Sequence, residues 1–254
     1  MTRRASVAAL CLAFGDMACG SDRASSPNTE PVAPAVTEAE TFGETHSGSY
    51  HLGPVDWAET AWHNACAPYP SALRALTGVY LAGVDGSLGA DGSLCDACAK
   101  VTTRLGKSIV VRLVTYGVSR SPGDMDLSPE AYDAIHEVDP QGTPDDPRPM
   151  SWQLAKCPDS GNIYFQYQTE ANVWWTSLWV RNGKLPIDGL EVRSANHAGF
   201  FALTRGGDGT FTDAGGFGEG EFELSVTGRG GQVLSQSFSG FEPGGLVESA
   251  LQFD

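Results

Sequence analysis

Three tryptophans, at positions 174, 175 and 179, lie within one short apolar run of the chain. An indole presents a large flat face at little cost in conformational entropy, so a row of indoles can stack on the axial C–H face of a sugar chain. Each stacked ring would contribute about 1 kcal/mol beyond the burial of its area. Neighbouring side chains of a strand point to opposite faces, however. Strict alternation therefore predicts that Trp175 lies on an open face and that Trp174 faces a core.

Cysteines and histidines are the next residues whose chemistry needs an account. Four cysteines follow the N-terminal leader, namely Cys66, Cys95, Cys98 and Cys157. In an exported chain an even number predicts two disulfides, with three possible pairings. Cys95 and Cys98 also have the spacing of half a zinc site or of a redox pair, but no second such pair follows, which favours structural disulfides. The five histidines have no ligand spacing, so we predict no metal and no other cofactor.

The first residues are typical of an export signal. A basic start at Arg3 and Arg4 precedes an apolar stretch over residues 5–14 that is too short to span a bilayer. A small residue before Cys19 resembles a bacterial lipoprotein signal and predicts lipidation of Cys19, whereas Asp16 is unusual there and favours ordinary signal-peptidase cleavage. We predict a signal peptide over 1–18 and a disordered linker over 19–41, because that stretch is rich in Ser, Pro, Thr, Glu and Ala.

Composition restricts the possible partners. The chain has 254 residues and a formal net charge of -15. This acidity disfavours nucleic acid, anionic membrane surfaces and acidic polysaccharides, although it also serves solubility alone. We expect a monomer that meets a membrane only through a lipid on Cys19.

The elements that must position these residues are short strands. The 31 Gly and 15 Pro separate short apolar runs, which indicates a mainly β fold. Up to about residue 149 the pattern predicts strands with two helical pieces, at 71–76 and 128–135. A stretch dense in Pro, Gly and Asp at 139–149 then precedes seven short strands, starting at 150–156, with the spacing of a β-sandwich. The predicted domains are 42–148 and 149–254.

Four segments together resemble the microbial expansins over roughly residues 42–239. They are Cys95–Thr102, Met125–Ile135, Met150–Asn162 and Trp174–Asn182. The resemblance implies a six-stranded double-psi β-barrel with an open polysaccharide groove, followed by an immunoglobulin-like sandwich that binds cellulose through a row of aromatics. It also implies that wall polysaccharides are loosened without being cleaved.

In the sandwich, the resemblance assigns the glycan platform to Trp174 and Trp175, both reaching one face because the strand twists or bulges. Trp179 would extend the platform. The family's third platform aromatic falls at about Asp208, and a family lysine is replaced by about Gln168. Both departures imply weaker binding to crystalline cellulose, or a different glycan.

In the barrel, the resemblance assigns the groove carboxylate to Asp126. The alternative is a structural turn residue before the helix at 128–135. Tyr116 occupies the place of a second family aspartate and would stack on the glycan or hydrogen-bond to it. Ser49 is the expected groove hydroxyl, with Thr45 as the alternative. Three loop aromatics would line the groove or pack as satellites of the core: Trp57, Trp62 and Tyr69.

Three functions compete on this basis. The first is an expansin-like protein that binds cellulose or a related β-glucan and loosens it without hydrolysis. The second is a wall hydrolase or lytic transglycosylase on the same barrel, which needs a second carboxylate ~6.5–9.5 Å from the first for inverting hydrolysis. Sequence candidates for that carboxylate are Asp56, Asp85, Asp91 and Asp96. The third is an adhesin that only binds.

Overall fold

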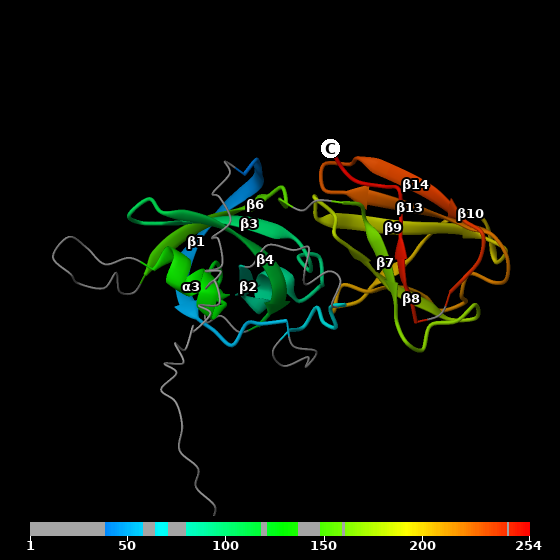
Figure 1. The fold of residues 1–254 in the computed structure, drawn as a ribbon, viewed down its shortest axis with the longest axis horizontal. Helices are drawn as coiled ribbons and strands as arrows, with labels where there is room; N and C mark the ends of the chain where they lie inside the picture. The colour runs from blue at the N-terminus through cyan, green and yellow to red at the C-terminus, as the bar shows by residue number, and fades with distance from the viewer. Residues whose placement is uncertain are drawn as a thin grey trace, which may run out of the picture. The chain divides into compact units, whose positions relative to one another are not determined.

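The computed structural model describes residues 39–57, 64–70, 80–117, 121–136, 148–158, 161–242 and 244–254 (Figure 1). All of them belong to one compact unit. Residues 1–18, Cys19, Trp62 and the helix predicted at 71–76 lie outside this part of the chain. Within it, no helix is long and apolar enough to cross a bilayer.

Six strands close into a barrel in the order β1-β5-β2-β4-β3-β6. They are β1 (Thr41–Leu52), β2 (Leu81–Val84), β3 (Cys98–Thr103), β4 (Ser108–Tyr116), β5 (Met125–Leu127) and β6 (Pro149–Ala155). The pairs β1–β5 and β2–β4 are parallel, and the other four pairs are antiparallel. The expected six-stranded barrel is confirmed.

Inward-facing apolar side chains fill the barrel. Val101, Leu113 and Leu127 are among the residues of this core with at most 1% of their surface exposed. Helix α3 (Pro129–Ile135) covers it with Ala131 and Ile135, as predicted. A shorter helix, α2 (Gly86–Gly89), follows β2 and was not predicted.

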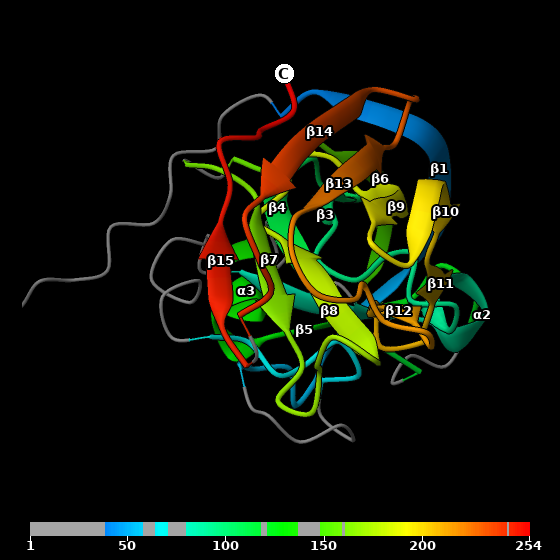
Figure 2. The same cartoon turned by 90° about the vertical axis from the view of Figure 1, so that its right-hand side faces the viewer.

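Two antiparallel sheets form the sandwich, in the orders β10-β9-β13-β14 and β11-β12-β8-β7-β15. The first contains β9 (Ile187–Ser194), β10 (His197–Ala202), β13 (Phe222–Gly228) and β14 (Val233–Phe238). The second contains β7 (Tyr164–Tyr167), β8 (Thr176–Arg181), β11 (Thr204–Arg205), β12 (Phe211–Asp213) and β15 (Leu246–Glu248). Figure 2 shows β10 at the edge of its sheet. The predicted fold class, a barrel followed by a sandwich, is confirmed.

One strand lies in a different sheet from the one predicted. The strand at 150–156 was expected to open the sandwich, but it is β6, which pairs with β1 and β3. Its alternation of buried and partly exposed residues is compatible with a strand of the barrel or of the sandwich. Only the pairing with strands distant in sequence decides between the two. The barrel therefore extends to Ala155, beyond the boundary expected after residue 148.

Two disulfides are present, as predicted. Cys66 bonds to Cys95, and Cys98 bonds to Cys157 across a sequence separation of 59. A closed loop of that length restricts the unfolded chain enough to stabilise the fold by about 4 kcal/mol in the chain-entropy account. The second disulfide joins the start of β3 to the segment after β6.

Candidate functional site

Asp126 lies in the middle of β5, between two other barrel strands. It is in register with His51 of β1 and Gly83 of β2. Its neighbours Met125 and Leu127 are fully buried in the barrel core, so alternation directs Asp126 away from that core. Asp126 is nevertheless only 9% exposed.

The backbone at Gly53 covers the carboxyl group of Asp126. A Cβ built on Gly53 would lie 2.5 Å from the Asp126 Cβ and 3.0 Å from its Cγ. No larger residue fits at position 53 without a shift of the chain. The enclosure makes Asp126 a sheltered carboxylate, which strengthens any hydrogen bond that it forms.

A second carboxylate that sequence reasoning missed lies beside it. Asp124 is 8% exposed and accepts a hydrogen bond from the backbone N–H of Ser49 at 2.8 Å. Its Oδ2 lies 3.6 Å from Nε2 of His51. The short spacing Asp-x-Asp was the available signal, because Asp124 immediately precedes the strand that carries Asp126. Ser49, His51, Asp124 and Asp126 therefore converge at the junction of β1 and β5.

Tyr116 does not share this face. The residue of β4 in register with Gly83 is Thr115, and Tyr116 pairs with Val84 instead. The half-buried Tyr116 ring packs against the barrel core. Its hydroxyl lies 3.1 Å from where a Cβ of Gly207, in the turn between β11 and β12, would be. The expected contact of Tyr116 with a glycan beside Asp126 therefore finds no support in this geometry.

Other residues expected near the groove lie elsewhere. The alternative hydroxyl residue, Thr45, is exposed and lines a shallow hollow with Lys100 and Trp152. Tyr69 is buried and meets the half-buried Trp57 edge to face, with ring centroids 5.1 Å apart. Both belong to a small cluster under the loop after β1, so satellite packing describes this aromatic pair.

The two adjacent tryptophans lie in a turn immediately before β8, not in the strand. Asn172 and Trp175 form an isolated bridge that closes the turn. The Asn172 Oδ1 accepts hydrogen bonds from the backbone N–H groups of Trp174 at 2.9 Å and Trp175 at 3.2 Å. These hydrogen bonds hold the backbone in a turn, so the two indoles do not alternate as they would in a strand. Asn172 was the residue in the sequence that could have predicted this turn.

The turn gives the two indoles different exposures. Trp174 is 65% exposed, whereas Trp175 is partly buried and packs against the sandwich core. Strict alternation predicted the opposite order and is wrong. One fully available indole with a half-buried neighbour is a smaller surface than two indoles lying side by side.

Trp179 does not extend that surface. It is 5% exposed, and its Nε1 donates to the carbonyl of Asp208 at 3.0 Å. The guanidinium of Arg181 lies over its ring, 5.0 Å from the ring centroid. Asp208 itself accepts from the backbone N–H of Thr210 and caps a turn. The expectation that Trp179 is a platform ring is therefore wrong, because its contacts with Asp208 and Arg181 leave the ring buried.

Gln168 is half-buried. Its N–H donates to the carbonyl of Ser177 at 2.9 Å. With Pro68 and Trp179 it lines a hollow of about 270 Å³. Among the described residues there is no cluster of three or more His, Cys, Asp or Glu side chains that could hold a metal ion.

Comparison of the sequence with known proteins finds expansin-like relatives. No protein-family model matches the chain. Expansin-like protein 6 of Dictyostelium discoideum is 23% identical over 167 residues, covering 64% of this chain and 56% of that protein. Expansin-YoaJ of Bacillus subtilis is 29% identical over 146 residues, covering 57% and 53%. The matched region thus spans little more than half the length of these relatives.

Solved structures share the architecture. A mutant Clavibacter michiganensis expansin in complex with cellohexaose superposes with a TM-score of 0.65 at 20% identity, covering 82% of this chain and 98% of that one. The apo form of the same expansin gives 0.65 at 21% identity, with the same coverage. The chain is thus a two-part β protein, a closed barrel followed by a sandwich. Its fold is that of the expansins, and the resemblance to expansin-like proteins is confirmed.

Proposed function

We propose that this protein binds cellulose or a related cell-wall β-glucan and loosens the packing of the chains without hydrolysing them. The observation that carries the proposal is Trp174, a large flat ring that is 65% exposed on a turn whose backbone is fixed by Asn172. Trp is enriched at surfaces that bind a partner, because its large flat ring gives contact area at little entropic cost. The expansin-like relatives and the cellohexaose complex of a similar structure support a polysaccharide as that partner.

Asp126 would act on a second glycan segment. Its sheltered carboxylate beside His51 can hydrogen-bond to sugar hydroxyls more strongly than it could in water. Loosening then requires that the protein binds a displaced chain better than a packed chain, and no bond need break. We propose that both binding surfaces act outside the cell, in keeping with the two disulfides. Cleavage of the leader and a lipid on Cys19 remain predictions.

Retention on insoluble polysaccharides tests the glycan surface. The exported form should be retained on cellulose, and Trp174→Ala should lower the affinity about two- to tenfold, because one stacked ring contributes roughly 0.5–1.5 kcal/mol. The measurement is depletion from solution by cellulose, chitin, xylan and peptidoglycan in parallel. Trp179→Phe is the control, since Trp179 is buried. Equal retention of Trp174→Ala and the wild type on all four materials would refute the proposed surface.

Replacing Asp126 by Asn separates the loosening function from binding alone. We expect that the variant still binds cellulose but loses the weakening of a cellulose sheet under load, because the neutral amide has one acceptor oxygen instead of two and makes weaker hydrogen bonds than a carboxylate. Weakening that survives in full would favour the adhesin, which only binds.

One observation favours a glycan hydrolase as a second candidate. Asp124 immediately precedes β5 and contacts His51, and Asp126 is in register with His51, so two carboxylates lie in the same region. Hydrolysis of a glycosidic bond needs a pair of carboxyl groups. Reducing ends released from glucan or peptidoglycan by the wild type, and lost with Asp124→Asn, would establish that activity. No release would leave the non-hydrolytic function.

A further inference from the structure

An exposed aromatic side chain on β10 lies outside the surface described so far. This edge strand carries Phe200 and Phe201, which are 43% and 46% exposed. The two rings lie on opposite faces, because neighbours in a strand alternate. Phe201 is in register with Val192, whose side chain is fully buried, so Phe201 lies on the side that faces the second sheet.

Phe201 is held in a fixed orientation. The His197 imidazole stacks on its ring, with centroids 4.2 Å apart and planes 3° from parallel. The Nε2 of His197 lies 2.7 Å from Oδ2 of Asp213, a carboxylate that is only 3% exposed. A buried acid thus fixes the imidazole, and the imidazole supports one face of the phenyl ring. An exposed ring that is already ordered loses little entropy when it binds a ligand.

This stack is continuous with the tryptophan turn. The segment after Asp213 runs between them: the N–H of Gly218 donates to the carbonyl of Val173 at 2.8 Å. A Cβ on Gly216 would lie 2.6 Å from the Cα of Trp174, so the two backbones touch. On the other side, Nδ2 of Asn196 donates to the carbonyl of Gly216 at 2.9 Å. One short segment therefore joins the Trp174 turn to the residue before His197.

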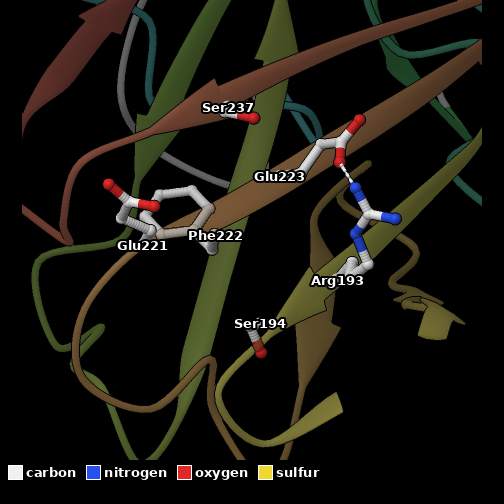
Figure 3. A pocket seen from close by; sticks show the side chains of 6 residues that line it. All are labelled: Arg193, Ser194, Glu221, Phe222, Glu223 and Ser237. Atoms are coloured by element: carbon white, nitrogen blue, oxygen red, sulfur yellow. Dashed lines mark hydrogen bonds and ion pairs between the residues drawn. The ribbon is translucent and has the colours of Figure 1, made fainter. Parts of the chain in front are cut away.

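Phe200 has a different environment on the opposite face. The guanidinium of Arg193 lies 5.1 Å from its ring centroid. Arg193 also pairs with Glu223, and the two line a shallow hollow of about 260 Å³ with Ser237 (Figure 3). The residues that line this hollow are polar or charged apart from Phe222. The Phe222 ring is only 4% exposed. The Phe200 face therefore suits solvent rather than a flat apolar ligand.

We propose that Phe201, supported by His197, is an additional glycan-stacking ring that continues the Trp174 surface. The inference rests on the proposed binding of a β-glucan and names a further subsite for it. The ligand is an extended, uncharged β-linked glucan, because its C–H faces match flat rings and the net charge of -15 opposes acidic chains. A chain lying across both rings crosses the 213–218 segment.

Comparing Phe201→Ala with Phe200→Ala tests this subsite. The two positions are adjacent and nearly equal in exposure, so the second variant controls for loss of apolar surface and for edge-strand stability. We expect Phe201→Ala to weaken binding of a long soluble cello-oligosaccharide about two- to tenfold, the effect of one ring. Phe200→Ala should leave the dissociation constant unchanged. Thermal unfolding of both variants checks that the sandwich is intact.

Trp174→Ala in the same titration separates failure of this inference from failure of the proposed function. If Trp174→Ala weakens binding while Phe201→Ala binds like the wild type, the subsite on β10 is overturned and the glycan surface remains. If Trp174→Ala also binds like the wild type, both are overturned. Weaker binding in Phe201→Ala and Trp174→Ala, but not in Phe200→Ala, supports the subsite.

Discussion

Tyr69 is a buried acid whose pKa is raised in the folded protein. It is 2% exposed and lies over the guanidinium of Arg181, 4.2 Å from the ring centroid. Burial raises the pKa of Tyr69 far above its usual value of about 10, and the negative charge of Asp96 raises it further. Ionising this phenol in the folded state is therefore much harder than in the unfolded chain.

Stability should consequently fall at alkaline pH. A group whose pKa is raised on folding stabilises the fold fully below its unfolded pKa, and that contribution is lost as the pH rises above about 10. Tyr69→Phe has no such ionisation, so its free energy of unfolding should fall less steeply between about pH 9 and 11 than that of the wild type. Urea unfolding at several pH values measures this, with Tyr164→Phe, a half-buried tyrosine, as control. Equal slopes for Tyr69→Phe and the wild type would contradict the argument.

Residue types were easier to predict than residue environments. Trp174 and Asp126 could be selected as candidates from the sequence, because aromatic clusters and the Met125–Ile135 motif are local. The burial of Trp179 was not, since it depends on Asp208 and Arg181, which come from other segments. His51 was considered only as a possible metal ligand and rejected, although its position beside Asp124 follows from a parallel strand pair distant in sequence.

At the scale of elements, length and local signals decided what could be predicted. Helix α3 was predicted because Ser128 caps it and Pro129 starts it, both readable locally. Strands β11 and β12 have two and three residues, too few for periodicity to appear. β5 is buried at all three residues, so it has no alternation to detect.

The assignment of β6 failed for a different reason. Its alternation correctly predicted a strand but could not say which sheet it would join, because the pairing partners β1 and β3 are distant in sequence. The Trp174 turn was also missed. The apolar run containing Trp174 was predicted as strand, but β8 begins only at Thr176, because Asn172 accepts hydrogen bonds from two backbone N–H groups. That barrel and sandwich fold as separate domains stays a prediction.

At the scale of the whole molecule, a buried arginine of the sandwich binds the barrel. Arg181, in β8, is 1% exposed, and its Nη1 lies 3.0 Å from Oδ2 of Asp96. Its Nη2 donates to the carbonyls of Cys66 at 2.9 Å and Pro68 at 3.0 Å. A second guanidinium, that of Arg112, lies 3.5 Å from the same carboxyl group. This network joins β8 to the segments at Cys66, Pro68 and Asp96, and the Cys98–Cys157 disulfide joins the start of β3 to the segment after β6.

Arg181→Met should destabilise the protein by about 3–5 kcal/mol, because it leaves the carbonyls of Cys66 and Pro68 unpaired and removes one of the two cations of a buried acid. Chemical denaturation followed by tryptophan fluorescence measures the loss. The matched control is Arg193→Met, which breaks an ion pair on a side chain that is 52% exposed, where we expect less than about 1 kcal/mol. Equal losses in the two variants would show that Arg181 contributes only packing. If the network couples the barrel to the sandwich, unfolding of Arg181→Met should show two transitions in place of one. Retention on cellulose at low denaturant should stay unchanged, because Trp174 lies outside the network.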